Sequence, residues 1–340
     1  MEISGSSQEQ IVSSNPPPFS DNHLKRVPFQ ERAFLLGNII GVNAHRVKRA
    51  SLKQRLVEGG YEVHETPHFL IGRKAETPLI VAHWFAPTAI DNDLGHYFME
   101  ELKPLGMLAN PQDFADVFGA VVNSVSPDDP QRAWHLFGTN TLQRYHALLA
   151  ENHHTPHCDS PIDVFATLYR RVCELHVGES LLDAGCSSGF LPLVLAERFP
   201  ALTRVVGVDI RTEQFAVARI LAEERHLGNV RFEQADLLND DLSALGHFDT
   251  VTVLHVLEHF TEVEMYHVLK NLLALTSRRL IIGVPYEPGE PEAAYGHRQL
   301  FTPTKLAAVG NWCLEQLGNG KAMCEDCAGG LLYVDRPADV

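Results

Sequence analysis

The feature that most constrains the fold of this chain is the segment LLDAGCSSGF at residues 181–190. An apolar run ends at Asp183, and Gly185 and Gly189 bracket a turn that leads into the helical pattern LPLVLAERF. A glycine at the first position accepts a positive φ and lets the backbone approach a ligand, while the second lets the new helix pack closely on the strand. The segment therefore predicts a strand, a tight nucleoside-binding turn and a helix.

The spacing of this turn distinguishes between nucleoside cofactors. A dinucleotide-binding loop reads G-x-G-x-x-G, whereas this loop reads D-x-G-x-S-x-G with Ser187 at its centre. This spacing favours S-adenosylmethionine over NAD. Two later strand-like runs, RVVGVD and NVRFEQAD, end at Asp209 and Asp236. Because strand-end acids of an open α/β sheet share one edge, Asp209 is predicted to accept hydrogen bonds from the ribose and Asp236 from the adenine amino group.

Six segments follow one another in the order and spacing of a known family: LLDAGCSSG, VVGVD, QAD, FDTVTVLHVLEHF, RRLIIGVP and HRQLFTPTKL. Through them, residues 160 to about 337 resemble the class I S-adenosylmethionine-dependent methyltransferases of the small-molecule type. The family usually has glycine where this chain has Ser187. The resemblance implies S-adenosylmethionine as the methyl donor and S-adenosylhomocysteine as the product. It implies cofactor contacts from Asp183, Gly185, Cys186, Ser187, Gly189, Asp209, Ile210, Asp236, Leu237 and His255, the last beside the sulfonium.

The alternation of strands and helices after residue 160 predicts an α/β fold with a doubly wound, mostly parallel sheet. By the resemblance, the sheet has seven strands and closes with an antiparallel hairpin made of residues 321–327 and 330–336. Four parts are predicted: a disordered tail at 1–22, an N-terminal domain at 23–152, a connector at 153–160 and the cofactor-binding domain at 161–340. The N-terminal domain is expected to be mainly helical, with a helix from Gln30 to Ile40, and to cover the substrate.

Residues 114–125 carry apolar side chains at helical spacing. A continuous apolar face of this kind needs a partner surface. The partner is either the rest of the N-terminal domain or the same helix in a second subunit, and a homodimer is the expected assembly.

The charge of the chain bears on its partners. The formal net charge is −15, from 43 acidic and 28 basic residues, which opposes the neutralisation of phosphates that nucleic-acid binding requires. No run approaches the length of a membrane span, and the first residues do not read as a secretory leader. We therefore expect a cytoplasmic protein, without nucleic-acid or membrane partners, whose six cysteines are reduced thiols.

Methyl transfer is an in-line displacement, so the enzyme aligns an acceptor lone pair with the sulfonium and removes a proton where the acceptor carries one. Histidine suits this task because its pKa lies near neutrality. His259 in HVLEHF and His297 in GHRQLF are the candidate bases, and Glu258 is a candidate to orient His259. The alternative is that His259 caps a helix and bonds only to the backbone.

The eighteen histidines of the chain also raise the question of a metal site. Two groups have suitable ligand types, and they are His153, His154, His157 with Cys158 in the connector, and His255, His259 with His297. The first group lies in polar connector sequence, and the second requires inward-facing rotamers, so no metal is predicted.

The predicted function is methyl transfer from S-adenosylmethionine to a small molecule, with secondary metabolism as the setting. The acceptor atom stays open among oxygen, nitrogen, carbon and sulfur. The alternative is a non-catalytic module that binds S-adenosylmethionine and acts as a regulator or partner.

Overall fold

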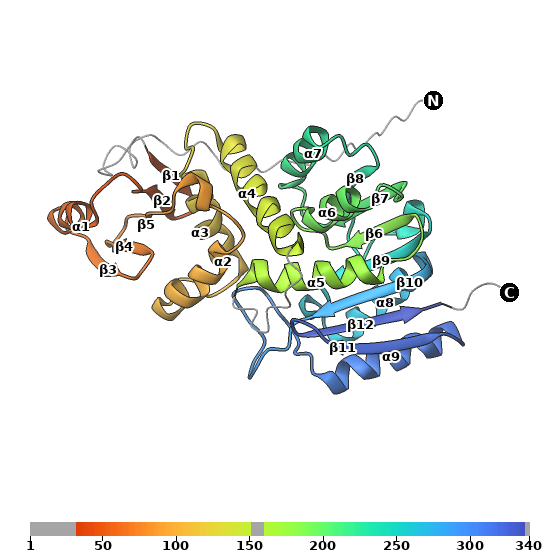
Figure 1. Cartoon of the computed structure of the whole chain (residues 1–340). Helices are drawn as coiled ribbons and strands as arrows, with labels where there is room; N and C mark the ends of the chain where they lie inside the picture. The colour runs from red at the N-terminus through yellow and green to blue at the C-terminus, as the bar shows by residue number, and fades with distance from the viewer. Residues whose placement is uncertain (1–31, 151–159, 337–340) are drawn as a thin grey trace, which may run out of the picture.

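A computed structural model describes residues 32–150 and 160–336 of the chain, which form two sheets with helices packed around and between them (Figure 1). The first sheet has five strands in the order β1-β2-β5-β4-β3, and the second has seven in the order β11-β12-β10-β9-β6-β7-β8. The predicted tail at 1–22 and the connector up to residue 159, with its candidate metal ligands, lie outside the described residues.

The N-terminal sheet is the main correction to the sequence predictions. The predicted helix from Gln30 to Ile40 is wrong in its described part, because Gly37 and Asn38 form a two-residue turn between β1 and β2. Gly37 has φ 55°, which such hairpin turns favour. The N-terminal domain is therefore not simply helical. Its strands are β1 (Ala33–Leu36), β2 (Ile39–Asn43), β3 (Glu62–Glu65), β4 (Phe69–Arg73) and β5 (Leu79–His83).

The apolar stripe at residues 114–125 lies on α3 (Pro111–Asn123), which Asn110 caps. The helix packs on β1, β2 and β5, and the side chains of Val117, Val121 and Val122 are fully buried there. Of the two partners predicted for the stripe, the structure shows the N-terminal domain itself. The predicted homodimer thereby loses the observation on which it was based. The other helices of this domain are α1 (Arg49–Glu58), α2 (Leu94–Tyr97) and α4 (Pro130–Ala150).

The C-terminal domain contains the seven-stranded sheet of the predicted α/β fold. Five strands, from β8 through β7, β6 and β9 to β10, pair in parallel, and β12 runs antiparallel to both β10 and β11. Ser160, Thr261 and Thr302 cap three helices, as predicted. The strands are β6 (Ser180–Ala184), β7 (Arg204–Asp209), β8 (Val230–Gln234), β9 (Phe248–Leu254), β10 (Thr276–Val284), β11 (Lys321–Asp326) and β12 (Gly330–Asp335). The helices are α5 (Pro161–Leu175), α6 (Phe190–Arg198), α7 (Phe215–Glu224), α8 (Glu262–Leu275) and α9 (Pro303–Leu317).

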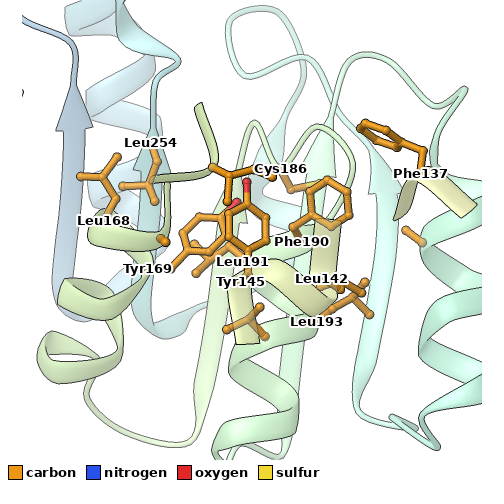
Figure 2. Packing of buried hydrophobic residues seen from close by; sticks show 14 of the residues in the cluster. Phe137, Leu142, Tyr145, Leu168, Tyr169, Cys186, Phe190, Leu191, Leu193 and Leu254 are labelled. Carbon is orange, nitrogen blue, oxygen red and sulfur yellow. The ribbon is translucent and has the colours of Figure 1, made fainter. Parts of the chain in front are cut away.

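The long helix α4 joins the two domains by contacting α3 on one side and α5, α6 and α7 on the other (Figure 1). The fully buried Tyr145 of α4 has its ring centroid 5.0 Å from that of Tyr169 and 5.7 Å from that of Phe190. Figure 2 shows these rings close to Cys186, in the turn after β6. The N-terminal domain thus packs directly against the predicted cofactor loop. Among the described residues, no helix is long and apolar enough to cross a bilayer.

The packing of α3 on β2 gives a test of stability. A Cβ at Gly41 of β2 would overlap the backbone carbonyl of Ala120. We expect Gly41→Ala to lower the free energy of unfolding by about 1–3 kcal/mol, the usual cost of overpacking. In the control Gly228→Ala, the new methyl group meets nothing within 4 Å, so stability should change by less than about 0.5 kcal/mol. Equal midpoints of urea unfolding for the two variants would contradict this packing.

Candidate functional site

Asp183 is the last residue but one of β6 and lies at the start of the predicted cofactor loop. Its side chain is buried, and its Oδ1 accepts a hydrogen bond from Thr252 Oγ1 at 2.7 Å. Burial raises the pKa of Asp183 to about 7, although the bond from Thr252 opposes this shift. A buried carboxyl group at the end of a central strand is thus held in place by the neighbouring strand β9.

The turn after Asp183 has a left-handed backbone. Gly185 has φ 81° and Gly189 has φ 74°, and a Cβ at Gly185 would overlap the side chain of Val256. Ser187 also has a positive φ, of 49°, although left-handed geometry is uncommon for residues other than glycine. Its N–H donates to Asp209 Oδ2 at 2.8 Å. This serine therefore keeps the backbone that the family usually builds with glycine, with a bond to Asp209 to support it.

Asp209 lies at the end of β7, beside this turn. Its carboxylate accepts the N–H of Ser187 on one oxygen and the N–H of Arg211, at 2.9 Å, on the other. Each carboxylate oxygen has a second lone pair, so both can still accept a hydroxyl group. The next side chain, Ile210, is 58% exposed and offers an apolar surface beside the acid. A ribose with its base would meet both kinds of group here.

The two residues predicted to contact the adenine, Asp236 and Leu237, already make contacts within the protein. Asp236 accepts the backbone N–H of Leu238 and of Asn239 on Oδ1, and the Asn239 amide on Oδ2 at 2.8 Å. The bond from the Asn239 side chain lowers the pKa of Asp236, so this acid is held ionised in its own turn. Leu237 is buried in the core between the sheet and α8. The adenine contacts of Asp236 and Leu237 stay predictions.

Cys186 has a structural place in the loop. Its N–H donates to the carbonyl of Val208 at 2.9 Å, and its own carbonyl accepts the N–H of Gly189. Its thiol packs against Gly207, and burial raises the pKa of the thiol. Contact between Cys186 and the cofactor stays a prediction.

A group of three histidines and two glutamates lies at the ends of β9 and β10. Glu258 and His259 belong to the short helix η7 (Leu257–His259) after β9, while Glu287 and His297 lie between β10 and α9. His297 Nδ1 is 2.8 Å from Glu287 Oε1, and His297 Nε2 is 3.9 Å from Glu258 Oε1. His255 Nδ1 is 3.8 Å from the same Glu258 oxygen. We call these five residues the histidine–glutamate cluster.

Glu258 is the buried centre of this cluster. Its side chain is 1% exposed, and neither carboxylate oxygen has a hydrogen-bond partner among the described residues. Burial raises the pKa of Glu258 to about 8, and burial lowers the pKa of His255 to about 4. His255 also has φ 52°, a strained backbone for a residue that is not glycine. Buried polar groups without partners cost about 1–3 kcal/mol each, so stability alone does not account for this arrangement.

Of the alternative reading of His259, the structure excludes the helix cap but shows a backbone contact, from Nδ1 to the carbonyl of Gly296 at 3.4 Å; its role as a base stays a prediction. The helix α8 is capped by Thr261, whose hydroxyl accepts the N–H of Glu264 in the predicted capping box. The exposed ring of His259 instead lies with its centroid 4.9 Å from that of His297. Glu258, which was predicted to orient His259, contacts His255 and His297 instead.

The partner of His297 was not found in the sequence. Glu287 lies ten residues before His297, and no spacing rule connects the two. The N-terminal domain also holds this segment, since Lys103 pairs with Glu292 and the ring of Phe114 lies 5.2 Å from that of Tyr295. The Tyr295 ring is in turn 5.7 Å from that of His297. Residues far apart in the chain thus set the position of His297.

The comparison with known families covers the segment that contains the cofactor loop and η7. Residues 181–278 match the sequence profile of a family described as a methyltransferase domain. Residues 181–278 therefore belong to a methyltransferase domain, as the resemblance to the class I S-adenosylmethionine-dependent methyltransferases implies. The methyl donor that this resemblance implies is S-adenosylmethionine. The glycines of the loop, the free lone pairs of Asp209 and the exposed Ile210 fit this cofactor.

Relatives of the methyltransferase domain are distant. The chain is 30% identical to a ubiquinone biosynthesis O-methyltransferase of Acinetobacter baylyi over 81 residues, which are 24% of this chain and 33% of that protein. The chain therefore spans about a third of the length of the curated relatives it matches.

Solved structures resemble the chain only loosely. An O-methyltransferase family protein from Burkholderia thailandensis has a TM-score of 0.48 and 14% identity, over 86% of this chain and 84% of that one. Magnesium protoporphyrin IX methyltransferase from Synechocystis PCC 6803 has a TM-score of 0.40 and 20% identity, over 59% and 96%. Likenesses at this level carry no conclusion about the substrate.

The position of Asp209 in the methyltransferase domain gives a test of cofactor binding. Asp209→Ala removes the acceptor for the ribose hydroxyls and the bond that supports Ser187. We expect the affinity for S-adenosylmethionine, measured by calorimetry, to fall by about 1.5–3 kcal/mol, the range for hydrogen bonds to a charged group. Asp128→Ala, at an exposed turn residue, is the matched control. Unchanged affinity in Asp209→Ala would remove this residue from the cofactor site.

Asp183 predicts a pH dependence of stability for the protein without cofactor. Its pKa of about 7 in the folded state lies above the ordinary value of 3.8, so the folded protein retains a proton that the unfolded chain loses. The stability contributed by this group is complete below about pH 4 and is lost as the pH rises through 7. Between pH 5 and 8, we expect the unfolding free energy of wild type to fall by about 2–3 kcal/mol relative to Asp183→Asn. Parallel curves for the two proteins would contradict the buried proton.

Proposed function

We propose that this chain transfers the methyl group of S-adenosylmethionine to a small-molecule acceptor. The observation that carries the proposal is the proximity of the histidine–glutamate cluster to the cofactor loop. Val256, in the segment of the cluster, packs over Gly185 of the loop, and the charges of Arg211 and Asp209 act on His259. Open α/β sheets bind ligands at this edge, where the strand order reverses between β6 and β9.

The chemistry requires an acceptor atom in line with the bond between sulfur and the methyl group. S-adenosylmethionine supplies an electrophilic methyl group, so the protein has to orient the acceptor and manage its proton. His259 is the exposed member of the cluster, and partial burial together with His297 lowers its pKa. It is therefore neutral near pH 7 and able to accept a proton. Glu258 and His297 lie next to His259 and are the other groups that we place on the side of the acceptor.

Two features support a small-molecule acceptor: the net charge of the chain and the contact of the N-terminal domain with the segment that carries His297. A net charge of −15 disfavours a nucleic-acid substrate. The N-terminal domain, which we place at residues 23–152, contacts the segment with His297 through Lys103 and Phe114. These contacts place the N-terminal domain where it can limit access to the acceptor side during the transfer step. We therefore infer a small acceptor, as in secondary metabolism, and a methyltransferase domain at residues 161–340.

The role of His259 is tested with its replacement by alanine. We expect His259→Ala to keep the affinity for S-adenosylmethionine and to lower turnover by about 10²–10⁴, the range for a lost proton acceptor. The acceptor is first identified by mass spectrometry of metabolite mixtures incubated with the protein and isotope-labelled S-adenosylmethionine.

His267→Ala, which changes an exposed histidine of α8, is the control and should keep wild-type turnover. Equal turnover in His259→Ala would end its assignment as an acceptor-side group. Tight binding of S-adenosylmethionine without labelling of any metabolite would favour the non-catalytic module.

A further inference from the structure

Three side chains of the histidine–glutamate cluster converge on one point. One ligand atom from each of Glu258, His259 and His297 lies within 4.8 Å of the other two. These residues come from two separate segments, one after β9 and one after β10, so the fold and not the sequence spacing brings them together. Two imidazoles and a carboxylate are a common ligand set for first-row divalent metal ions.

Glu258 brings a buried carboxyl group without a hydrogen-bond partner among the described residues to this point. Both of its carboxylate oxygens are buried, and the described residues provide no donor to either. The distance of 3.9 Å from Glu258 Oε1 to His297 Nε2 is too long for a hydrogen bond. Two ligands about 2.1 Å from a tetrahedral ion lie about 3.4 Å apart, which requires only a small movement from this geometry. A bound cation would satisfy the carboxylate without rebuilding the site.

Both histidines have Nδ1 next to an oxygen acceptor and Nε2 free, which is the usual arrangement of a metal-binding histidine. His297 Nδ1 lies 2.8 Å from Glu287 Oε1, so an Nδ1–H donating to Glu287 leaves a lone pair on Nε2 facing Glu258. His259 Nδ1 lies 3.4 Å from the carbonyl of Gly296, which leaves its Nε2 free in the same way. A carboxylate behind a metal-binding histidine fixes its tautomer and ring orientation. Glu287 is therefore a positioning residue for His297.

We propose that Glu258, His259 and His297 bind a divalent cation of the zinc, manganese or cobalt type. Three protein ligands leave at least one position for water or for an oxygen atom of the acceptor. The assignment of that position to the acceptor rests on the proposed function, whereas cation binding itself does not. With the cation bound, His259 would serve as a ligand in place of a proton acceptor, and the cation would make a bound hydroxyl group lose its proton more readily than a free one.

The experiment measures cation binding by the full-length chain in the absence of S-adenosylmethionine. The protein is stripped with EDTA, dialysed, and titrated with Zn²⁺, Mn²⁺ and Co²⁺ by calorimetry. We expect one saturable site that Glu258→Gln and His297→Ala weaken by about 100-fold or more, and Glu287→Gln by about 10–100-fold. Bound Co²⁺ should give a visible spectrum without a band from thiolate ligands. Glu262→Gln and His267→Ala, at exposed positions of α8, should bind as wild type does.

Two further variants make the result decisive. His259→Ala changes an exposed ligand without disturbing the core, so it tests the site even if Glu258→Gln unfolds in a thermal melt. Replacement of His153, His154 and His157 together should leave the site intact. Wild-type affinity in both His259→Ala and His297→Ala, or loss of binding only in the triple variant, would overturn the proposal. Intact binding of S-adenosylmethionine without cation binding would overturn this inference alone, whereas cation binding without methyl transfer would overturn the proposed function alone.

Discussion

The parallel pairing of β6 with β7 on one side and with β9 on the other is the constraint on which the site depends. This pairing aligns three strand ends, so that Asp183, Asp209 and His255 leave the sheet at one edge. The bonds from Thr252 to Asp183 and from Ser187 to Asp209 then join neighbouring strand ends to one another. The cofactor loop is thus braced from both sides, and its left-handed turns are maintained by these bonds as well as by glycine.

The features that could be predicted from the sequence are those set by local backbone chemistry. The positive φ angles of Gly185 and Gly189 and the caps at Thr261 and Thr302 each follow from a few adjacent residues. The five-stranded sheet was missed because short apolar runs have no period that separates a strand from a buried helix. The hairpin at Gly37 was the available signal, since a Gly-Asn pair between two apolar runs is typical of a two-residue turn.

The arrangement of the candidate site was predictable only in part. The sequence placed Asp209 and the histidines after the correct strands, because parallel strands have their carboxyl ends at one edge. The pairing of His297 with Glu287 could not be read from it, because both residues lie in an irregular segment held by distant parts of the chain. The burial of Glu258 also depends on tertiary packing, since its neighbour His259 in the same short helix is exposed.

The contact of Tyr145 with Tyr169 and Phe190 has a consequence for cooperativity. One continuous apolar core contains Phe69 and Val81 of the N-terminal sheet together with residues of α4, α5 and β6. We therefore expect the two sheets to unfold together and not as independent bodies. A ligand that binds only the folded state stabilises everything that unfolds with its site. Occupation of the loop after β6 thereby strengthens the N-terminal sheet as well, although that sheet contributes no residue to the cofactor loop.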